Sequence, residues 1–593
     1  MRTKYCGNVK IQDVNKIIKL CGWVHKIRNF GQFIFIDMRD STGLIQVIFE
    51  CKNYIAFKIA TTLRNEFCIQ IFGCVRKREE KNINSKINTG NIEILASHLN
   101  ILNTSKALPL DYINLHNYDD ARLKYRYLDL RRLDILENLK IRNNVNYLIR
   151  TFMTKKNFLD IETPILTKST PEGARDYVVP SRNYHGKFYA LPQSPQLFKQ
   201  LLMISGIDKY YQITKCFRDE DLRSDRQPEF TQIDIEMSFV DSYQIRNLTE
   251  KLIKHIWLKT LNIKLNKFPV MSFQDAIKKY GTDKPDLRNP MEIIDVLNIF
   301  KNKKSQLFFN LNCQKNNRIA LLCVSEKLKI SRKIINNYIE YIRKNHSSKL
   351  FYIKIKKTYD EDQSISSSIT KILNKKIFEQ LIKKSKAKNG DILFLMADEE
   401  NIVNKALGLL RIKIGNDFNI VKKSQWNPVW IKNFPMFEKD SQGNYSSSHH
   451  PFTAVKKHHV NKLKNEPHFA ISDSYDLIIN GYEIGGGSVR IHDANMQRKI
   501  FDILGMEKHI QKNKFSFFLE ALEYGAPPHA GIALGLDRIV MMLTNSKNIR
   551  DVIAFPKTTS ATCLMTESPS KLDKSTLQEL GIKLNIKQKY KDF

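Results

Sequence analysis

The stretch from residue 210 to residue 239 limits most strongly how this chain can fold, because its side chains alternate in character. In its second half, one face is apolar apart from a threonine and consists of Thr231, Ile233, Ile235, Met237 and Phe239. The other face carries one ring and four polar groups, namely Phe230, Gln232, Asp234, Glu236 and Ser238. A period of two predicts a strand with a core face and a polar face.

The first half of the stretch places Gln212, Thr214 and Arg218 on one side, and a polar loop at 219–228 follows it. We therefore predict a hairpin whose polar face is the floor of a binding site. The alternative is an amphipathic hairpin that faces water. The polar face carries short hydrogen-bonding groups beside an aromatic ring instead of the lysines that dominate the chain elsewhere, and this favours a specific ligand.

Size and composition exclude several classes of protein. With 593 residues, of which 42% are hydrophobic, the chain is long enough for several domains with ordinary cores. No apolar run reaches membrane-spanning length, and the first residues, MRTKYCGNVK, lack an apolar signal core. The nine cysteines form no CxxC pair. We therefore expect a cytoplasmic protein with reduced thiols, no zinc site, no disulfide framework and no membrane contact.

The net charge of +35 is weak evidence for a polyanionic partner. Residues 1–100 carry +8, residues 289–420 carry +12, and the remaining 361 residues carry +15. Charge per residue is therefore about twice as high in these two regions as elsewhere. A lysine-rich solvated surface, produced by drift in composition, explains most of the excess.

Residues 1–105 predict a five-stranded OB-type barrel, a fold that commonly binds oligonucleotides. Strands are expected at 18–24, 33–39, 44–49, 67–75 and 92–101, with a helix at 55–65 after the third. Arg28, Phe35 and Gln46 could then offer a cation, a stacking ring and an amide to unpaired bases. The alternative for Phe35 is a place in the barrel core.

After a charged linker at 106–133, a long amphipathic helix is expected at 134–157. Pro164 then interrupts an apolar strand, and proline in a strand indicates an edge or an interface. Residues 280–288, YGTDKPDLR, are polar and prone to turns. Residues 289–420 have strand and helix signals of their own and are interpreted as an inserted module without evident chemistry.

Asn480-Gly481 lies between two apolar runs and predicts a type I′ hairpin. In such a hairpin Asp476 and Glu483 project from the same face, and two carboxylates suit a hard cation such as Mg²⁺. Residues 485–487 are glycines, which let the backbone approach a ligand closely. No GxxxxGK[ST] motif occurs, so the chain has no P-loop.

Seven stretches in order resemble the class II aminoacyl-tRNA synthetases, and specifically the bacterial-type aspartyl branch. FLDIETPIL, FRDE…RQPEFTQIDIE and GIALGLDR resemble the three motifs of the class. STPEGARDY, YALPQSPQLFKQLL, SSHHPFT and GYEIGGGSVRIH resemble segments of the aspartyl branch. The third motif has Ala533 where a second glycine is usual, which is a mild change.

The resemblance implies an α+β multidomain protein. It consists of an OB-fold anticodon-binding domain (1–105), a linker or hinge (106–133) and a catalytic domain in two parts (134–288 and 421–555). An inserted α+β domain (289–420) and a C-terminal extension (556–593) complete it. The catalytic domain is expected to hold an antiparallel sheet of six to seven strands flanked by helices. The resemblance also implies a homodimer with the Pro164 segment at the two-fold interface.

The implied activity is aspartate–tRNA ligation, in which aspartate attacks the α-phosphorus of ATP and is then transferred to the terminal adenosine of tRNA-Asp. Neither step needs a protein nucleophile, so catalysis rests on positioning and on neutralising phosphate charge. The resemblance makes Arg218 and Arg538 the catalytic residues. It places the following at ATP: Arg218, Asp219, Glu220, Gln227, Phe230, Glu483, Gly535, Leu536, Asp537 and Arg538. Asp476 and Glu483 would hold Mg²⁺.

The resemblance places Lys199 and Arg490 at the side-chain carboxylate of the substrate L-aspartate, with His449 close by. The remaining implied contacts of aspartate are Glu172, Ser194, Gln196, Arg218 and Asp234. Asparagine would leave the buried Lys–Arg pair uncompensated, at a cost of roughly 3–5 kcal/mol. His450 is interpreted as structural, and His458-His459 as solvated.

Three alternatives stay open. An asparaginyl or lysyl enzyme of the same subgroup is the nearest, but a lysine pocket needs acids at positions 199 and 490, and those relatives lack the insertion. An inactive RNA-binding paralogue is the second. The third is an enzyme that also charges tRNA-Asn, which depends on how the barrel reads the last anticodon base near Phe30 and the 76–81 loop.

Overall fold

This computed structural model describes residues 1–109, 119–170, 172–222, 225–300, 317–346, 349–355, 365–367, 375–422 and 424–585. The chain forms two compact units. The first comprises Met1–Asn144, Asp221–Pro228 and Val540–Lys574, and the second comprises Val145–Glu220, Glu229–Ile539 and Ser575–Phe593. Parts of the predicted linker, of the inserted module and of the C-terminal extension lie outside the described residues.

A closed five-stranded barrel opens the first unit, as the sequence predicts. Its strands are β1 (Ile17–Asn29), β2 (Phe33–Asp40), β3 (Gly43–Glu50), β4 (Cys68–Lys77) and β5 (Ile92–Asn103), in the order β1-β2-β3-β5-β4. The helix α1 (Tyr54–Ala60) follows the third strand but is shorter than expected. It stops early because the hydroxyls of Thr61 and Thr62 donate to the carbonyls of Lys58 and Ile59 and so satisfy its last turn.

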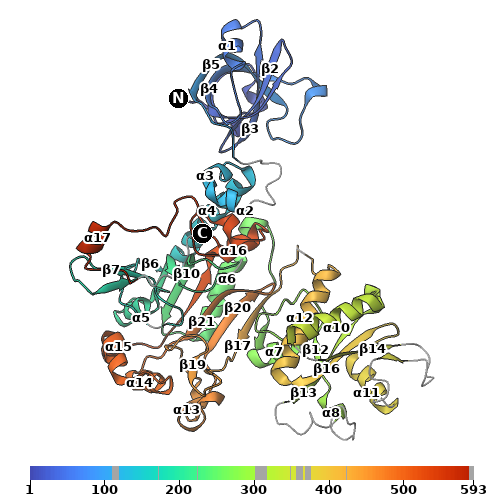
Figure 1. Ribbon diagram of the computed structural model, residues 1–593, viewed down its shortest axis with the longest axis vertical. Coiled ribbons are helices and arrows are strands. Elements are labelled where there is room, and N and C mark those ends of the chain that lie inside the picture. The colour runs from blue at the N-terminus through green and yellow to red at the C-terminus, as the bar shows by residue number, and fades with distance from the viewer. Residues whose placement is uncertain are drawn as a thin grey trace. The chain divides into compact units, whose positions relative to one another are not determined.

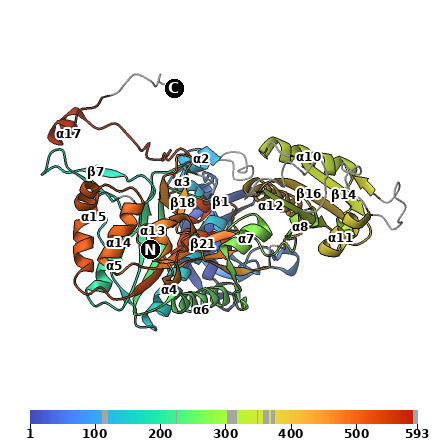
Figure 2. The same ribbon diagram turned by 90° about the horizontal axis from the view of Figure 1, so that it is seen from below.

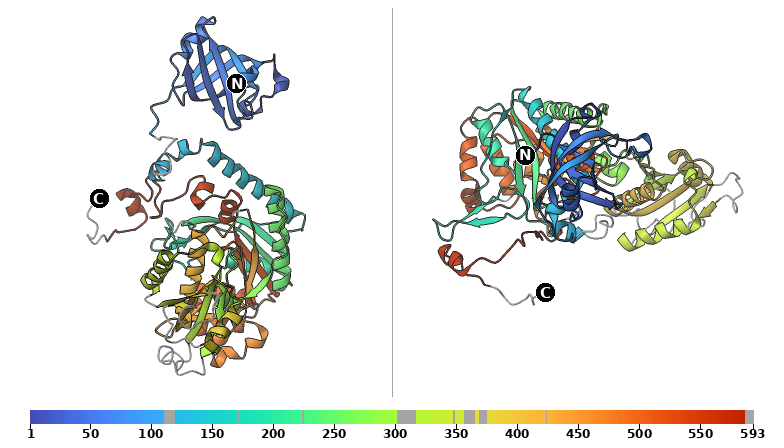
Figure 3. Two further views of the ribbon diagram at one scale, coloured as in Figure 1. Left: turned by 90° about the vertical axis from the view of Figure 1, so that its right-hand side faces the viewer. Right: turned by 90° about the horizontal axis from the view of Figure 1, so that it is seen from above.

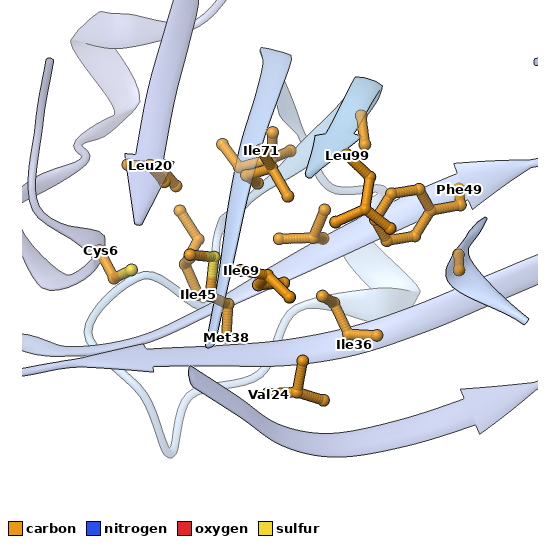
Figure 4. Packing of buried hydrophobic residues seen from close by; sticks show 14 of the residues in the cluster. Cys6, Leu20, Val24, Ile36, Met38, Ile45, Phe49, Ile69, Ile71 and Leu99 are labelled. Atoms are coloured by element: carbon orange, nitrogen blue, oxygen red, sulfur yellow. The ribbon is translucent and has the colours of Figure 1, made fainter. Parts of the chain in front are cut away.

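The barrel closes around one apolar core, and Figure 3 shows its strands wrapping around that interior. Alternate residues of each strand point inward, so the side chains labelled in Figure 4, apart from Cys6, come from the barrel strands, and every strand contributes. Ile36, Ile45 and Ile71 are fully buried there. Burial of this kind stabilises the fold by about 25 cal/mol per Å² of apolar surface.

In the first unit, the short helices α2 (Asp119–Lys124) and α3 (Arg126–Asp129) pack on the chain after residue 540. The buried Arg126 donates to the carbonyls of Arg550, Ile553 and Ala554 and pairs with Asp129. Charged residues of the predicted linker therefore form a structural ion network around Asp129.

The second unit is built on an eight-stranded mixed sheet in the order β11-β17-β20-β21-β22-β10-β9-β6. The strands are β6 (Leu159–Asp160), β9 (Lys209–Phe217), β10 (Glu229–Ser238), β11 (Val270–Ser272), β17 (Pro428–Lys432), β20 (Ser474–Ile479), β21 (Tyr482–Val489) and β22 (His529–Gly535). Figure 1 labels β6, β10, β21, β20 and β17 in this order across the sheet, with β9 and β22 among them.

Two sheet expectations need correction. The six central strands are antiparallel as expected, but β11 and β6 add short parallel pairs at the edges. The apolar strand expected around Pro164 is only the two residues of β6, because the chain leaves the sheet before the proline, which has no N–H to donate to a ladder.

Helices cover the sheet. They are α4 (Leu133–Thr154, expected at 134–157), α5 (Gln196–Ile204), α6 (Ser242–Leu261), α14 (Ala494–Ile503), α15 (Lys508–Leu522) and α16 (Leu536–Leu543). A capping box of Asp241 and Gln244 starts α6. Figure 2 shows α5, α14 and α15 together, where they share an apolar cluster centred on Phe452 and Phe515.

The inserted module, also in the second unit, has its own five-stranded antiparallel sheet in the order β12-β13-β16-β14-β15. Its strands are β12 (Ile293–Asp295), β13 (Asn317–Val324), β14 (Leu350–Ile355), β15 (Ile365–Ser367) and β16 (Ile392–Glu399). The helices α10 (Arg332–His346) and α12 (Glu400–Asp417) pack on one face, and α8 (Leu297–Phe300) and α11 (Lys375–Ser385) on the other.

The remaining elements are short. They are β7 (Val178–Pro180), β8 (Phe188–Ala190), α7 (Phe273–Tyr280), β18 (Phe437–Lys439), β19 (Tyr445–Ser447), α13 (Lys462–Asn465) and α17 (Lys574–Glu579). Among the described residues, no helix is long and apolar enough to cross a membrane.

Candidate active site

The predicted hairpin exists as β9 and β10, and its register places polar residues in rows that run across the sheet. Asp234 lies opposite Gln212 on one side and Ala533 on the other. Ala533 in turn lies opposite Gly486, and Gly486 opposite Asp476. Directly opposed residues share a face, so this row brings Asp234 and Asp476 to the same side of the sheet with only small residues between them.

The polar face is buried at Asp234, Glu236 and Ser238 and partly buried at Phe230 and Gln232, so the alternative that it faces water is wrong. Asp234 and Glu236 are completely inaccessible to solvent. Phe239, expected on the core face, is instead 70% exposed, because β10 ends at Ser238 and Phe239 takes a left-handed backbone conformation.

Gly531 on β22 has no side chain, so the side chain of Glu236 on β10 can extend across β22 to Arg490. A Cβ at Gly531 would lie 1.9 Å from Oε2 of Glu236. Through this gap the carboxylate of Glu236 accepts hydrogen bonds from Nε of Arg490 at 2.9 Å and from its Nη2 at 3.1 Å. The glycine in GIALG is therefore required for a buried, bidentate ion pair.

Lys199 completes this cluster from α5. Its Nζ donates to Oδ1 of Asp234 at 2.7 Å and lies 3.2 Å from Oε2 of Glu236. Burial raises the pKa of Asp234, against the pull of Lys199. Burial also works to raise the pKa of Glu236, but Arg490 and then Lys199 outweigh it and hold that pKa at about 2. Glu236 is therefore ionised throughout the physiological range.

The two histidines of SSHHPFT have different partners. Nε2 of His449 lies 3.2 Å from Oδ1 of Asp476, and this carboxylate raises the pKa of His449 although burial opposes it. Nε2 of His450 accepts from Nη1 of Arg490 at 2.6 Å, and burial followed by Arg490 holds its pKa well below the ordinary value. His450 thus touches the predicted substrate-binding arginine, a contact that the sequence reading missed.

One buried oxygen of the cluster is left for a ligand. Oδ2 of Asp234 has no hydrogen-bond partner among the described residues. A buried carboxylate oxygen without a donor is costly, and a bound ammonium group would satisfy it.

Glu172 and Ser194 lie at a pocket beside this cluster. Ser194 donates to Oε2 of Glu172 at 3.0 Å, and burial raises the pKa of Glu172 to about 7. Both residues line the pocket, together with Thr170, Asp176 and Phe517.

Gln196, which is also predicted to contact aspartate, makes a hydrogen bond within α5 in this structure. Its amide donates to Gln200 at 2.8 Å within α5, and Gln200 in turn lies 3.0 Å from His529. Gln196 is 5% exposed, so a role at a ligand would require this bond to change.

The other end of the hairpin carries the predicted nucleotide contacts. The guanidinium carbon of Arg218 lies 5.0 Å from the ring centre of Phe230, within cation–π range. Across the sheet, Nη1 of Arg538 donates to the carbonyl of Glu483 at 2.7 Å. Arg218 therefore lies beside the ring of Phe230, and Arg538 lies beside the backbone of Glu483.

The predicted residues at the start of α16 have structural partners. Asp537 is 2% exposed, and its Oδ2 accepts from the backbone N–H of Thr231 at 2.7 Å, which ties the helix to β10. Leu536 is fully buried, and Gly535 lies opposite Gln232 in the sheet.

The predicted nucleotide contacts in and beside the 219–228 loop differ in their partners and burial. Asp219 forms an isolated bridge with Arg175, and Glu220 is partly buried. Gln227 belongs to the first unit, where its amide makes two bonds with the backbone of Lys557, at 2.7 Å and 3.1 Å. A nucleotide contact by Gln227 would compete with this pairing.

Asp476 and Glu483 converge as the hairpin geometry predicts. Ile478 lies opposite Glu483, and a bulge follows. A Cβ on Gly486 would lie 2.8 Å from Oδ1 of Asp476 and 3.8 Å from Oε1 of Glu483. The two carboxylates thus share the space that the glycine leaves open.

No cluster of three or more metal-binding side chains occurs among the described residues, so a cation here would need ligands beyond these two carboxylates. His458, of the second histidine pair, is exposed. The eight cysteines in the described part of the chain are free thiols.

The three predicted RNA-binding residues lie together on the outside of the barrel. Arg28 lies opposite Phe35, and it forms a two-point ion pair with Asp37 and a 3.2 Å bond to Gln46. Phe35 packs against Phe30 at 5.7 Å between ring centres and lies outside the core cluster, so the alternative that it belongs to the core is wrong.

Glu236, His450 and Lys284 contact predicted site residues, although the sequence did not indicate a ligand-binding role for any of them. Glu236 was visible on the polar face of the hairpin, and its acidic side chain two residues after Asp234 was an available signal. His450 was visible only as a neighbour of His449. Lys284 pairs with Oε2 of Glu483 at 2.8 Å, and nothing in its local sequence points there.

Comparison with known proteins gives consistent results along the chain. Residues 118–559 match the family described as class II tRNA synthetases (D, K and N), and residues 18–102 match the OB-fold nucleic acid binding domain. The chain is 72% identical over 583 residues to the aspartate–tRNA ligase of Buchnera aphidicola subsp. Acyrthosiphon pisum (strain Tuc7), covering 98% of this chain and 99% of the relative. It is 50% identical over 586 residues to that of Haemophilus ducreyi, covering 99% of both.

Solved structures show the same fold at much lower identity. Asparaginyl-tRNA synthetase from Pyrococcus horikoshii, complexed with asparaginyl-adenylate, aligns with a TM-score of 0.58 at 18% identity, covering 94% of this chain and 98% of that one. A putative aspartyl-tRNA synthetase from Leishmania major aligns with a TM-score of 0.56 at 16% identity, covering 92% of both.

Proposed function

The chain belongs to the class II tRNA synthetases of the D, K and N group, and we propose that it ligates L-aspartate to tRNA-Asp with ATP as the activating substrate. In the first step an oxygen of the aspartate α-carboxylate attacks the α-phosphorus, and pyrophosphate leaves. In the second step a hydroxyl of the terminal adenosine attacks the carbonyl carbon of the mixed anhydride, and AMP leaves. Relatives with curated aspartate–tRNA ligase names support this activity over nearly the whole chain.

The observation that carries the proposal is the distribution of charge on one sheet face. Lys199 and Arg490 pair with Asp234 and Glu236 in the second half of β10, and the Arg218–Phe230 contact lies at the start of that strand. An acidic amino acid at the first end and a nucleotide at the second would be adjacent, as the first step requires.

At the nucleotide end, Phe230 offers a ring for adenine, and Arg218 offers a forked donor for the α-phosphate. Arg538 approaches from α16 and would meet the terminal phosphates. Positive charge held in fixed places stabilises the charge that builds on the phosphates without reorganisation at the moment of reaction. The carbonyl of Glu483 orients Arg538 for this role.

At the aspartate end, the proposed partners of the side-chain carboxylate are Lys199, Arg490 and His449. The unpartnered Oδ2 of Asp234 supports a contact with the substrate ammonium group. Glu172 adds a second carboxylate at this end and reaches it through Ser194.

Asp476 and Glu483 are the proposed holders of Mg²⁺, and the cradle above Gly486 fits a small cation between their oxygens. When bound, the ion would offset phosphate charge. His449 contacts the carboxylate of Asp476, and Lys284 contacts that of Glu483.

The barrel is proposed to bind the anticodon through Arg28, Phe35 and Gln46, which supports tRNA as the second substrate. We also propose a homodimer across the Pro164 segment, a cytoplasmic location consistent with a substrate used in translation, and the domain boundaries at 105, 133, 288, 420 and 555.

Pyrophosphate exchange tests the function directly. We expect ATP–pyrophosphate exchange that depends on aspartate and is absent with asparagine or lysine. Charging assays on tRNA-Asp and tRNA-Asn then define the RNA specificity. Exchange with lysine or asparagine alone would assign the chain to another branch, and no exchange with any amino acid would indicate an inactive paralogue.

A further inference from the structure

Lys284 lies in the polar segment before the inserted module, yet its ammonium group is at the nucleotide end of the site. Its Nζ is 2.8 Å from Oε2 of Glu483. The side chain is 38% exposed, so it meets solvent on one side and the carboxylate on the other.

The stem of the inserted module holds this segment in place. Arg411 of α12 is 1% exposed and donates to the carbonyls of Asp286 at 2.8 Å, Asn289 at 2.5 Å and Met291 at 2.6 Å. The side-chain amide of Asn289 donates back to the carbonyl of Arg411 at 3.0 Å. These bonds satisfy buried carbonyls and fix the path of the chain on which Lys284 stands.

Close backbone contacts complete the attachment at both ends. Gly281 has φ +71°, and a Cβ there would lie 2.1 Å from the carbonyl oxygen of Asn404 in α12. A Cβ on Gly481, in the turn of the β20–β21 hairpin, would lie 3.4 Å from Cβ of Asp286. The segment is therefore held between α12 and the hairpin that carries Asp476 and Glu483.

Glu483 thus lies between two cations. Arg538 holds its backbone carbonyl, and Lys284 holds its carboxylate. A lysine ammonium is a compact charge on a flexible stem, so it can move from a carboxylate to a phosphate oxygen within a few ångströms.

We propose that Lys284 is a further residue of the nucleotide site, on a segment that the inserted module fixes, and that its ammonium group binds a phosphate oxygen of ATP. This inference rests on the proposed function. It also gives the inserted module a role in the first step, because α12 fixes the segment that carries this lysine.

The test compares Lys284→Gln and Lys284→Arg with the wild-type full-length protein. A matched control is Lys279→Gln. Lys279 lies on the preceding helix α7, its side chain is half-exposed, and its Nζ lies 3.5 Å from Oε2 of Glu292. Aspartate-dependent exchange gives the KM for ATP and for aspartate separately. Calorimetry with ATP alone gives the affinity without any reaction.

We expect Lys284→Gln to raise the KM and the Kd for ATP about tenfold, equivalent to about 1.4 kcal/mol, and to leave the KM for aspartate within about twofold. Lys284→Arg should restore ATP binding to within about threefold of wild type, and Lys279→Gln should match wild type. A purely structural ion pair would instead lower thermal stability or affect both substrates equally.

Unchanged ATP binding in Lys284→Gln, an equal rise in both KM values, or no rescue by arginine would overturn the inference. If the wild type exchanged no pyrophosphate, the proposed function would fail, whereas the calorimetric comparison would still decide whether Lys284 binds phosphate.

Discussion

Glu236 changes how the amino-acid end of the site works. The sequence suggests that Lys199 and Arg490 would lack a negative partner unless aspartate were bound, but Glu236 contacts both cations. The expected uncompensated pair is therefore wrong. The preference for aspartate over asparagine must therefore depend on the balance of the whole cluster, which includes His449 beside Asp476.

Lys199→Leu is expected to abolish aspartate activation while ATP binding persists. Removing this cation leaves Asp234 and Glu236 buried with one partner fewer, a loss of roughly 3–5 kcal/mol. Exchange with aspartate should fall by at least about 100-fold, and calorimetry should still detect ATP.

The control is Lys215→Leu, an exposed lysine of the same hairpin. It should retain wild-type exchange. Normal aspartate-dependent exchange in Lys199→Leu would refute the assignment of Lys199 to the substrate carboxylate.

Glu172 predicts a pH dependence of aspartate binding. Burial raises its pKa to about 7, so the carboxyl is neutral below this pH and ionised above it. Only the ionised form attracts an ammonium group, so the affinity for aspartate should rise by up to about tenfold between pH 6 and pH 8.

The KM for aspartate, measured by exchange across this range, checks the pH prediction. Glu172→Gln should flatten the profile, whereas Glu162→Gln, which alters an exposed acid, should preserve it. A profile that keeps its slope in Glu172→Gln would assign the titration to another group.

At the scale of elements, strand β2 presents an unusual surface. Phe35 packs with Phe30 and Phe33, which are 67% and 39% exposed, beside the Arg28–Asp37 ion pair. Exposed aromatic rings beside a cation are the arrangement on which unpaired bases stack.

Phe35→Ala is expected to weaken tRNA charging through the KM for tRNA and to leave pyrophosphate exchange unchanged. Loss of one stacked base costs about 1–3 kcal/mol. Tyr54→Ala, which removes an exposed ring from α1, is the matched control and should charge normally. An equal loss of exchange and charging would show that Phe35 acts through the stability of the protein.

At the scale of the whole molecule, the β6 edge of the large sheet carries exposed apolar side chains. Leu159 in β6 and Leu166 beyond Pro164 are 55% and 53% exposed, and Ile165 is 40% exposed. Exposed apolar side chains beside an edge strand are a typical interface between copies of a chain.

Leu166→Glu should therefore convert a dimer into a monomer, because a buried charge without a partner destabilises an interface. Light scattering after size-exclusion chromatography measures the mass. Leu102→Glu alters a 42% exposed leucine of the barrel and should leave the dimer intact. A wild-type protein that is monomeric at micromolar concentration would refute the proposed interface.

Local sequence patterns were enough to predict the elements that carry the site. Alternation over residues 210–239 predicted the β9–β10 hairpin, and Asn480-Gly481 predicted a turn that aligns Glu483 with Ile478. Both are short-range effects of backbone geometry, in which a period of two or a two-residue turn decides which side chains share a face. The barrel strands followed from the same kind of pattern.

Only the tertiary structure decided which charges meet. Glu236 reaches Arg490 because Gly531, nearly 300 residues away along the chain, leaves space between them. Lys284 reaches Glu483 because Arg411 holds its segment from a different helix. Such pairings depend on long-range packing and on desolvation in a shared interior, and local sequence carries no signal for either.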